Sequence, residues 1–382
     1  MIIIPANIAV NTMWIHEHHN WPDFSWYTER LASKLAEIRY RQGLLLGRME
    51  RLGFELKNEA SLNTLTNDIV KSSAIEGEIL NPEEVRSSIA SRLGLDAARL
   101  VSVNLTVDGF VEMMLDATQK FTAPLTKERL FDWHAALFPT GCSAVRRITV
   151  GGWRSAESGP MQVVSGSIGR EKVHFEAPNA ERLENEMRLF FNWFESKDGV
   201  DPVLRAGIAH LWFVTIHPFE DGNGRIARAI ADMSLARADG IQERFYSLST
   251  QIESERKGYY DILEKQQSGT PEITGWLEWF LDCLGRSVAG AENMLENVLF
   301  KAKLWDNINL RPVNSRQSLI INRMLEDDFE GYMNTSKYAK LAKCSTDTAL
   351  RDIQALKVRG VFIQNPGGGR STSYRLMDQV QN

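Results

Sequence analysis

The sequence predicts a mainly α-helical protein with a β-hairpin insert and a separate C-terminal domain. Most of the chain has apolar residues at helical spacing, interrupted by capping residues and by Pro or Gly. Residues 148–178 depart from that pattern, because short β-prone runs there flank Gly-rich turns. Beyond residue 316, helical stretches precede two apolar runs joined by a Gly-rich turn, which is the order of a winged helix-turn-helix.

Composition places the chain among ordinary globular proteins. Its 382 residues suffice for two or three domains, and 43% are hydrophobic and 24% charged. A net charge of -5 argues against nonspecific nucleic-acid binding by the whole chain. The three cysteines form no metal-ligand spacing and suit a reducing compartment. No apolar run reaches the length of a membrane span, and residues 1–5 do not make a signal peptide. A cytoplasmic protein without membrane contact is therefore expected.

The N-terminal part is interpreted as a helical extension, residues 1–58, ahead of a core at 59–305. Residues 14–26 are rich in Trp and His. Such a cluster could bind metal, but acidic and thiol partners are sparse, which favours a surface turn that packs aromatics. A helix is expected over 27–52 and another over about 62–77, where Gly77 is a C-cap.

Further helices and one hairpin follow. Asn81 and Pro82 begin a helix, since proline suits the first turn. Helical patterns continue over 107–117 and 127–138, and His134 in the second is interpreted as a packing residue. The β-prone runs at about 161–176 predict a hairpin.

The segment 217–228 combines a sharp turn with a new helix. An apolar helix over 203–216 must end at Pro218, which cannot continue it. Gly222, Asn223 and Gly224 tolerate positive φ, so their N–H groups can form a concavity. The helix that starts at about Arg225 directs its unpaired N–H groups and positive dipole end at the same place. This arrangement predicts an anion site that suits phosphate.

The side chains of this segment fit phosphate chemistry. Arg225 and Arg228 share a helix face and can both hold phosphate oxygens. Asp221 is a hard oxygen ligand of the kind that Mg²⁺ shares with substrate phosphates. His217, with an ordinary pKa of about 6.5, could accept a proton from a hydroxyl that attacks phosphorus. Together these groups predict phosphoryl or nucleotidyl transfer.

This segment resembles the core motif of the Fic (filamentation-induced-by-cAMP) family, His-Pro-Phe-x-Asp/Glu-Gly-Asn-Gly-Arg-x-x-Arg, and matches it without a gap. The resemblance implies transfer of AMP from ATP to a Ser, Thr or Tyr hydroxyl of a target protein, the protein itself included. It also implies roles for the motif residues. His217 is then the base and Asp221 the Mg²⁺ ligand, Gly222, Asn223 and Gly224 bind phosphates, Arg225 holds them in place, and Arg228 meets the γ-phosphate.

The stretch from Ser72 to Gly77 resembles the inhibitory motif of Fic proteins, Ser/Thr-x-x-x-Glu-Gly/Asn. On spacing alone, a helix end with a solvated Glu76 is the plainer interpretation. A carboxylate at a helix C-terminus is mildly unfavourable, however, which points to a nearby cation. The resemblance implies that Glu76 pairs with Arg228 and occupies the γ-phosphate site. Since this helix precedes the core, the chain resembles the class with an N-terminal inhibitor.

Two more site assignments come from the resemblance alone. The hairpin at 161–176 is then the flap that holds the target by strand pairing, with Val173, His174 and Phe175 as contacts. Tyr259 and Tyr260 match a Tyr pair beside the adenine. Relatives often carry Asn about two turns later, where this chain has Gln266 and Gln267.

The C-terminal tail is interpreted as a linker, 306–315, and a winged helix domain, 316–382. Residues 311–382 hold 11 Lys and Arg against 7 Asp and Glu. This modest basic excess allows DNA binding, with Thr346, Thr348 and Arg351 toward the groove and Arg370 on the wing. The fold also serves protein contacts, so both uses stay open.

Three functions fit the sequence. The first is an ATP-dependent adenylyltransferase inhibited by Glu76. The second is a DNA-binding regulator whose core senses a nucleotide. The third is removal of AMP from a target, with Glu76 positioning a water. A donor other than ATP is open, because a phosphate cradle does not read the base, and a homodimer that tunes the inhibitory helix is a candidate assembly.

Overall fold

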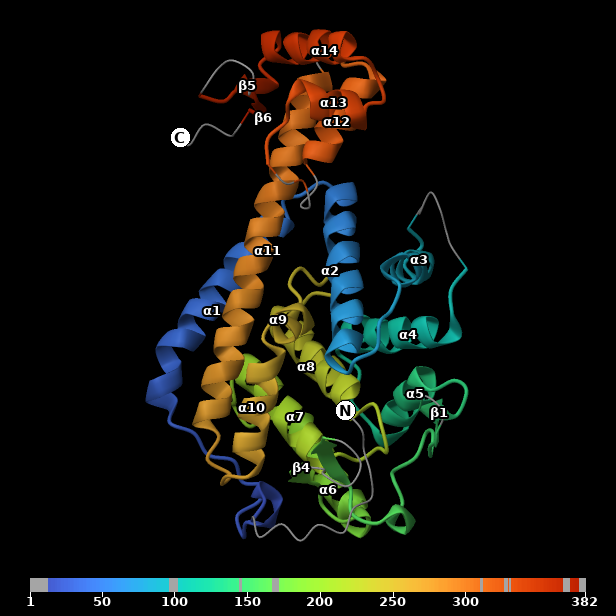
Figure 1. The fold of residues 1–382 in the computed structure, drawn as a ribbon. Coiled ribbons are helices and arrows are strands. Elements are labelled where there is room, and N and C mark those ends of the chain that lie inside the picture. Colours follow the sequence, from blue (N-terminus) through green and yellow to red (C-terminus); the bar gives the residue numbers. More distant parts are fainter. Residues whose placement is uncertain are drawn as a thin grey trace. The chain divides into compact units, whose positions relative to one another are not determined.

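The computed structural model describes residues 13–95, 102–143, 146–166, 172–309, 312–325, 329, 331–366 and 372–377. The chain divides into two compact units, Met1–Glu292 and Asn293–Asn382. The predicted mainly helical fold is confirmed, since the described strands form only three two-stranded antiparallel sheets among the helices (Figure 1). Within the described residues, no helix combines the length and apolar character that a membrane crossing needs.

The helices and strands have the following bounds. The helices of the first unit are α1 Thr28–Met49, α2 Phe54–Ile75, α3 Pro82–Arg92, α4 Leu105–Gln119, α5 Lys127–Leu137, α6 Leu183–Phe194, α7 Pro202–Ile216, α8 Asn223–Asp239, α9 Leu248–Ser254 and α10 Arg256–Gln267. Helix α11, Thr274–Asn309, continues into the second unit, which holds α12 Ser315–Met324, α13 Thr335–Leu341 and α14 Thr346–Val358. The sheets pair β1 Cys142–Ser143 with β2 Arg146–Arg147, β3 Gln162–Ser165 with β4 Lys172–Glu176, and β5 Phe362–Gln364 with β6 Tyr374–Leu376.

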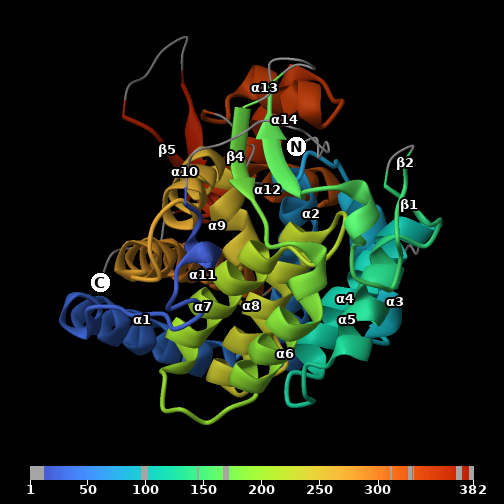
Figure 2. The same ribbon diagram turned by 90° about the horizontal axis from the view of Figure 1, so that it is seen from below.

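The centre of the first unit is the helix pair α7 and α8. Every residue of α7 from Val203 to Ile216 is buried, so this mostly apolar helix is surrounded by other parts of the unit (Figure 2). Gly207 lets α11 approach closely, because a Cβ there would lie 2.9 Å from the Phe280 ring. The indole of Trp276 donates to the Gly207 carbonyl oxygen at 2.8 Å. The loop between α7 and α8 is thereby supported by two fixed helices.

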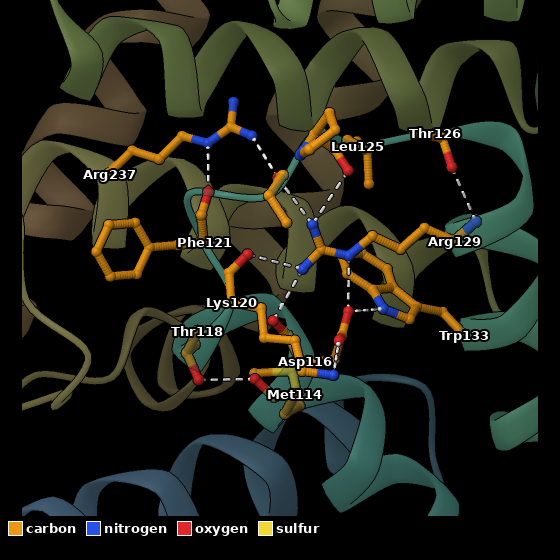
Figure 3. Close-up of polar contacts among 12 residues, drawn as sticks. Met114, Asp116, Thr118, Lys120, Phe121, Leu125, Thr126, Arg129, Trp133 and Arg237 are labelled. Carbon is orange, nitrogen blue, oxygen red and sulfur yellow. Dashed lines mark hydrogen bonds and ion pairs between the residues drawn. The ribbon is translucent and has the colours of Figure 1, made fainter.

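Helix α5 is held against α4 by a polar corner (Figure 3). The Asp116 carboxylate accepts from Arg129 Nε at 2.7 Å and from Trp133 Nε1 at 2.8 Å. Arg129 also donates to carbonyl oxygens of the turn after α4, among them that of Ala123 at 2.9 Å. The Arg237 side chain of α8 reaches the same turn. These contacts fix α5, and His134 in the following turn of α5 contacts the loop between α7 and α8.

The structure corrects three predictions. Helix α2 begins at Phe54, directly after Gly53, so the expected boundary at 58/59 falls inside a helix. Helix α11 continues to Asn309, into the predicted linker at 306–315, and the boundary between the units lies within it. Residues 14–26 pack aromatic rings as expected, with Trp21 against Trp212, but Trp14 and His16 are buried instead of lying at the surface. Local patterns did not reveal these differences, since each depends on packing against distant elements.

The second unit has the predicted order of elements. Asn334 and Ser345 cap α13 and α14, accepting from Lys337 N at 2.8 Å and Thr348 N at 3.2 Å. Its core is apolar and includes Ile320, Ile321, Tyr338, Ile353, Leu356, Phe362 and Leu376. Three helices followed by a hairpin agree with a winged helix-turn-helix, an assignment that stays a prediction. Arg370 lies outside the described residues.

The close approach of α4 and α5 generates a stability prediction. A Cβ on Gly109 would lie 1.8 Å from the Ala136 carbonyl oxygen, so Gly109→Ala must displace α5. We expect a destabilisation of about 2–3 kcal/mol and a lower melting temperature. The matched change Gly258→Ala meets no atom within 4 Å in α10 and should be neutral or stabilising. Equal melting temperatures for the two variants would contradict the close packing of α4 on α5.

Candidate active site

The loop between α7 and α8 begins with a left-handed residue. His217 has φ 50° and ψ 58°, and its N–H still donates to the Phe213 carbonyl oxygen at 3.0 Å. Positive φ is uncommon for residues other than glycine and costs energy unless the surroundings hold it. Here Phe219 supplies one support, because its ring is buried and stacks on His134 with centroids 4.2 Å apart. The turn therefore reverses the chain immediately after α7.

The end of the loop forms the predicted concavity at the start of α8. Gly222 caps α8 with φ 83°, a backbone conformation that favours glycine. A side chain is also excluded sterically, because a Cβ would lie 2.9 Å from the Phe138 ring. The Asn223 side chain closes the loop by accepting from Phe219 N at 3.0 Å and donating to Phe219 O at 2.8 Å. Since its amide group is engaged in this way, the phosphate contact expected of Asn223 falls to its backbone N–H.

The imidazole of His217 is held as a neutral base. Its Nδ1 lies 3.2 Å from the Val214 carbonyl oxygen, which can only accept, so Nδ1 carries the proton and Nε2 keeps a lone pair. Burial, with the nearby Arg154 charge, lowers the pKa of His217 to about 4. The ring is therefore uncharged at neutral pH, with its one proton on Nδ1.

Arg154 is a positioning residue that the sequence did not reveal. It is 4% exposed and donates from Nε to the His217 carbonyl oxygen at 2.8 Å. Its backbone N–H donates to Pro218 O at 2.9 Å, and its Nη2 donates to Pro178 O. Burial lowers its pKa to about 10, so it stays charged at neutral pH. No sequence signal marks this role, because 63 positions separate Arg154 from His217.

Arg228 of α8 is almost fully buried, at 1% exposure, and lies against the end of α2. Its Nε donates to Ser72 Oγ and its Nη2 to the Ser72 carbonyl oxygen, both at 2.8 Å. Its Nη1 forms an ion pair with Glu76 Oε1 at 2.9 Å. Although burial alone would lower the pKa of Arg228, the Glu76 carboxylate raises it. The structure thus places Glu76 at the arginine that the family resemblance assigned to it, and it adds Ser72 as a second partner of the same guanidinium.

Arg225 is equally buried but has a different partner. Its Nη1 donates to Glu78 Oε2 at 2.7 Å, while Asp221 Oδ1 is 3.7 Å from its Nη2. The guanidinium lies over the Phe138 ring, 5.0 Å from the centroid. Its buried Nε–H has no hydrogen-bond partner among the described residues. A buried donor without a partner is costly, and an oxygen-rich anion would satisfy it. Glu78 was not expected in this site.

Asp221 lies at the edge of the site, and its side chain is 32% exposed. Its Oδ1 accepts from Gly222 N at 2.6 Å, and its Oδ2 accepts from Ser143 Oγ of β1. The described residues contain no group of three or more His, Cys, Asp or Glu placed to hold a metal. A single accessible carboxylate beside Arg225 nevertheless fits Mg²⁺ that arrives with substrate phosphates and keeps several waters.

His134 supports the loop from below and is the packing residue that the sequence predicted. Its Nδ1 accepts from Gly151 N and its Nε2 donates to the Asp221 carbonyl oxygen, each at 3.2 Å. Burial lowers the pKa of His134 to about 4, which keeps the ring neutral and this donor–acceptor assignment fixed. His134 therefore positions Asp221 through the backbone.

The two tyrosines of α10 differ in exposure. Tyr259 is buried, and its hydroxyl is 2.9 Å from His210 Nε2. Tyr260 is partly exposed and donates to the Ile75 carbonyl oxygen at the end of α2, at 3.1 Å. Of the pair expected beside adenine, Tyr260 is therefore the one with accessible surface. Gln266 and Gln267, the two glutamines near the position expected to carry Asn, are both buried, and Gln267 donates to Thr215 Oγ1 at 3.3 Å.

The predicted hairpin is confirmed as β3 and β4, with a register irregularity between Val163 and Val164. Val173 is partly exposed. His174 lies between Ser165 and Glu264, with its Nδ1 2.6 Å from Glu264 Oε2 of α10. The side chain of Phe175 is buried beneath the hairpin, which leaves Val173 and His174 as the expected flap contacts with accessible side chains.

The N-terminal segment supports this hairpin. The Trp14 and Phe175 rings meet edge to face with centroids 5.4 Å apart, in a small core with Met161 and Ala177. His16 Nε2 is 2.8 Å from the Glu176 carbonyl oxygen. Aromatic enrichment at 14–26 was the only sequence signal, and it did not identify the hairpin as the partner.

Comparison with known families agrees with this geometry. Residues 124–235 match the model described as "Fic/DOC family". This chain carries a Fic/DOC domain. Residues 14–95 match a second model, described as "Domain of unknown function (DUF4172)". The Fic domain contributes Arg225 and Arg228, and the other matched segment contributes Glu76 and Glu78, so the ion pairs between α2 and α8 join the two.

Several relatives are named as adenylyltransferases. A "Protein adenylyltransferase Fic" of Nematostella vectensis is 24% identical over 226 residues, which cover 58% of this chain and 47% of the relative. A "Probable protein adenylyltransferase" of Aquifex aeolicus is 30% identical over 141 residues, which cover 35% and 43%. The chain thus spans less than half the length of these relatives. A solved Fic family protein of Desulfovibrio desulfuricans aligns with a TM-score of 0.49 and 20% identity, over 91% of this chain and 97% of the other.

The environment of His217 generates a pH prediction. We expect its ring to titrate near pH 4, as followed by NMR of labelled histidines, because burial and Arg154 disfavour the imidazolium. Arg154→Gln removes one of these two causes and should raise the pKa of His217, though not to 6.5, since burial remains. The change Arg188→Gln on the exposed face of α6 is the control and should leave the titration unchanged. A His217 pKa that is identical in the Arg154 variant and the parent would contradict the assigned interaction.

Proposed function

We propose that the protein is an adenylyltransferase that transfers AMP from ATP to a hydroxyl side chain of a target protein. The supporting observation is a neutral imidazole, His217, at the mouth of a helix N-terminus that also carries two buried arginines. A base beside an anion cradle is what nucleotidyl transfer to a hydroxyl requires. The Fic domain and the names of the relatives agree with this function.

In the proposed reaction the target hydroxyl oxygen attacks the α-phosphorus of ATP. A P–O bond to the target forms, the P–O bond to the β-phosphate breaks, and pyrophosphate leaves. The hydroxyl proton passes to Nε2 of His217, which is available because Nδ1–H is bonded to the Val214 carbonyl oxygen. Arg154 maintains the left-handed backbone that aims this ring.

The start of α8 binds the phosphates. The first-turn N–H groups after Gly222 and the positive end of the helix attract them, and the guanidinium groups of Arg225 and Arg228 supply charge. Asp221 would hold Mg²⁺, which neutralises part of the phosphate charge when bound. Tyr260 is the proposed adenine contact.

Glu76 makes the described state an inhibited one. Its carboxylate pairs with Arg228 at 2.9 Å, and a γ-phosphate would need the same guanidinium. Gly224 adds a steric argument, because a Cβ there would lie only 2.1 Å from Glu76 Oε1. The carboxylate therefore lies directly on the backbone that a phosphate would approach. Displacement of Glu76 is then a condition for productive ATP binding.

The flap is the proposed docking site for the target. An extended target segment would add to the β3–β4 hairpin by backbone hydrogen bonds, which hold a hydroxyl side chain in place without specifying its neighbours. Val173 and His174 contribute accessible side chains, while Trp14 and Phe175 keep the hairpin fixed from beneath.

A labelling experiment tests this function. Parent protein, Glu76→Gly and His217→Ala are incubated with Mg²⁺ and ATP labelled at the α-phosphate, and label is followed on the protein and on added lysate proteins. We expect Glu76→Gly to label about tenfold more strongly than the parent, since about 1.4 kcal/mol of competition for Arg228 is removed. His217→Ala should not label, because the base is lost. Glu83→Gly, in the exposed first turn of α3, is the control and should behave as the parent. Absence of label on Glu76→Gly that binds ATP would contradict transfer.

The reverse reaction is tested with the same materials. If Glu76 instead positions a water for removal of AMP, parent protein should release AMP from proteins that Glu76→Gly has labelled. Glu76→Gly itself should not release it. Release that depends on Glu76 and His217 would favour a de-AMPylase as the main function.

DNA binding by the second unit is a second candidate function. It is supported by the order of helices and hairpin and by the exposure of Thr346 and Arg351 at α14. In this case the full chain should retard duplex DNA in a gel, and Arg351→Ala should weaken that binding and its salt dependence. His217→Ala should bind DNA as the parent does. Binding that is equal for parent and Arg351→Ala would argue against α14 as the reading helix.

A further inference from the structure

We propose that Glu78 is a second inhibitory carboxylate, which holds Arg225 as Glu76 holds Arg228. The turn that follows α2 would then block two phosphate positions, one common to ADP and ATP and one that only ATP fills. This inference rests on the proposed function, because the competitor of Glu78 is a nucleotide phosphate.

Glu78 and Arg225 are in close contact, and only the arginine is buried. Glu78 Oε2 accepts from Arg225 Nη1 at 2.7 Å, and the side chains are 45% and 3% exposed. Asp221 is more distant from this arginine, at 3.7 Å. Glu78 is therefore the nearest countercharge of a buried guanidinium. Because the carboxylate itself is accessible to solvent, it can leave without crossing packed side chains.

The backbone explains why both carboxylates face α8. Gly77, with φ 87°, follows the last turn of α2, and Glu78 N donates to Ser73 O at 3.1 Å while Gly77 N donates to Ala74 O at 3.0 Å. These two bonds form a Schellman motif, which folds the residue after the glycine back against the helix end. One capping motif thus fixes the positions of Glu76 and Glu78 together.

The electrostatics favour this arrangement only while α8 is free of nucleotide. Two carboxylates at the C-terminus of α2 are unfavourable for that helix, whose dipole is negative there. The N-terminus of α8 is positive and adds Arg225 and Arg228, whose buried charges need partners. The oxygens of Glu76 and Glu78 therefore occupy the places of phosphate oxygens, one at each arginine.

The two pairs should sense different phosphates. Arg225 lies beside Asp221, the proposed Mg²⁺ ligand, and so at the phosphates that both ADP and ATP carry. Arg228 lies one turn deeper, where the proposed γ-phosphate position is. Glu78 then competes with ADP and ATP alike, whereas Glu76 competes with ATP alone.

Calorimetric titration with Mg·ADP and Mg·ATP tests this difference. The full chain carries His217→Ala to prevent turnover, and is compared with the same chain that also carries Glu78→Gln, Glu76→Gln or the control Glu83→Gln. We expect Glu78→Gln to tighten binding of both nucleotides by about tenfold, because the competing charge is removed. Glu76→Gln should tighten ATP binding and leave ADP binding unchanged. Glu78→Asp, which keeps the charge on a shorter side chain, should fall between the parent and Glu78→Gln.

The outcomes separate the two proposals. If Glu78→Gln matches Glu83→Gln for both nucleotides while Glu76→Gln tightens ATP, Glu78 is only a surface ion pair and the proposed function stands. If Glu78→Gln tightens ATP but not ADP, the assignment of Arg225 to the shared phosphates is wrong. If no variant binds either nucleotide, the proposed function fails and this inference fails with it. Melting curves confirm that every variant is folded.

Discussion

The architecture depends on the burial of the Arg228 guanidinium. A charge at 1% exposure is stable only with partners, and removal of one partner from such a pair costs about 3–5 kcal/mol. Ser72 provides two of these partners and Glu76 the third, all from a helix more than 150 positions away in the sequence. The position of α2 on α8 is therefore set by a charge that catalysis is proposed to use. In the proposed function, a nucleotide replaces Glu76 only by offering that charge an equivalent anion.

Residues outside the motif fix the backbone conformation of the loop before α8. Arg154 holds the carbonyl groups of His217 and Pro218, and His134 holds that of Asp221. Each is buried, and His134 has a lowered pKa that keeps it a neutral donor. The motif residues could not adopt this geometry by local preference, because a left-handed histidine is disfavoured on its own. Hence the strain at His217 is offset by contacts from elements far along the chain.

The sequence predicts those features that depend on local chemistry. Pro218 predicted the end of α7, and the Gly-rich turn at 222–224 predicted the start of α8. Asn81 and Pro82 predicted the start of α3, and each of these limits agrees within one or two residues. The pairing of Glu76 with Arg228 came only from the resemblance to Fic proteins, since spacing alone favoured a solvated carboxylate. Arg154, Ser143 and Glu78 were missed because their partners lie about 60 to 150 positions away and no periodic pattern encodes such contacts. Phe175 shows a related limit: alternation along a strand does not say which face another segment will cover.

Gly224 gives the start of α8 room for the Glu76 carboxylate and, in the proposed active state, for a phosphate. An added Cβ would lie 2.1 Å from Glu76 Oε1 and 3.3 Å from Arg228 Nη1, so any side chain would exclude the carboxylate from its present position. In the proposed function, a phosphate approaches the first N–H groups of α8 through the same space. A carboxylate is planar and a phosphate group is tetrahedral, but both present anionic oxygen acceptors. Because Gly224 has no side chain, either group fits beside it. The proposed inhibitory contact therefore requires no structure beyond the proposed nucleotide site. It needs only an acidic residue at a helix end, and the Schellman turn at Gly77 brings Glu76 and Glu78 to α8 together.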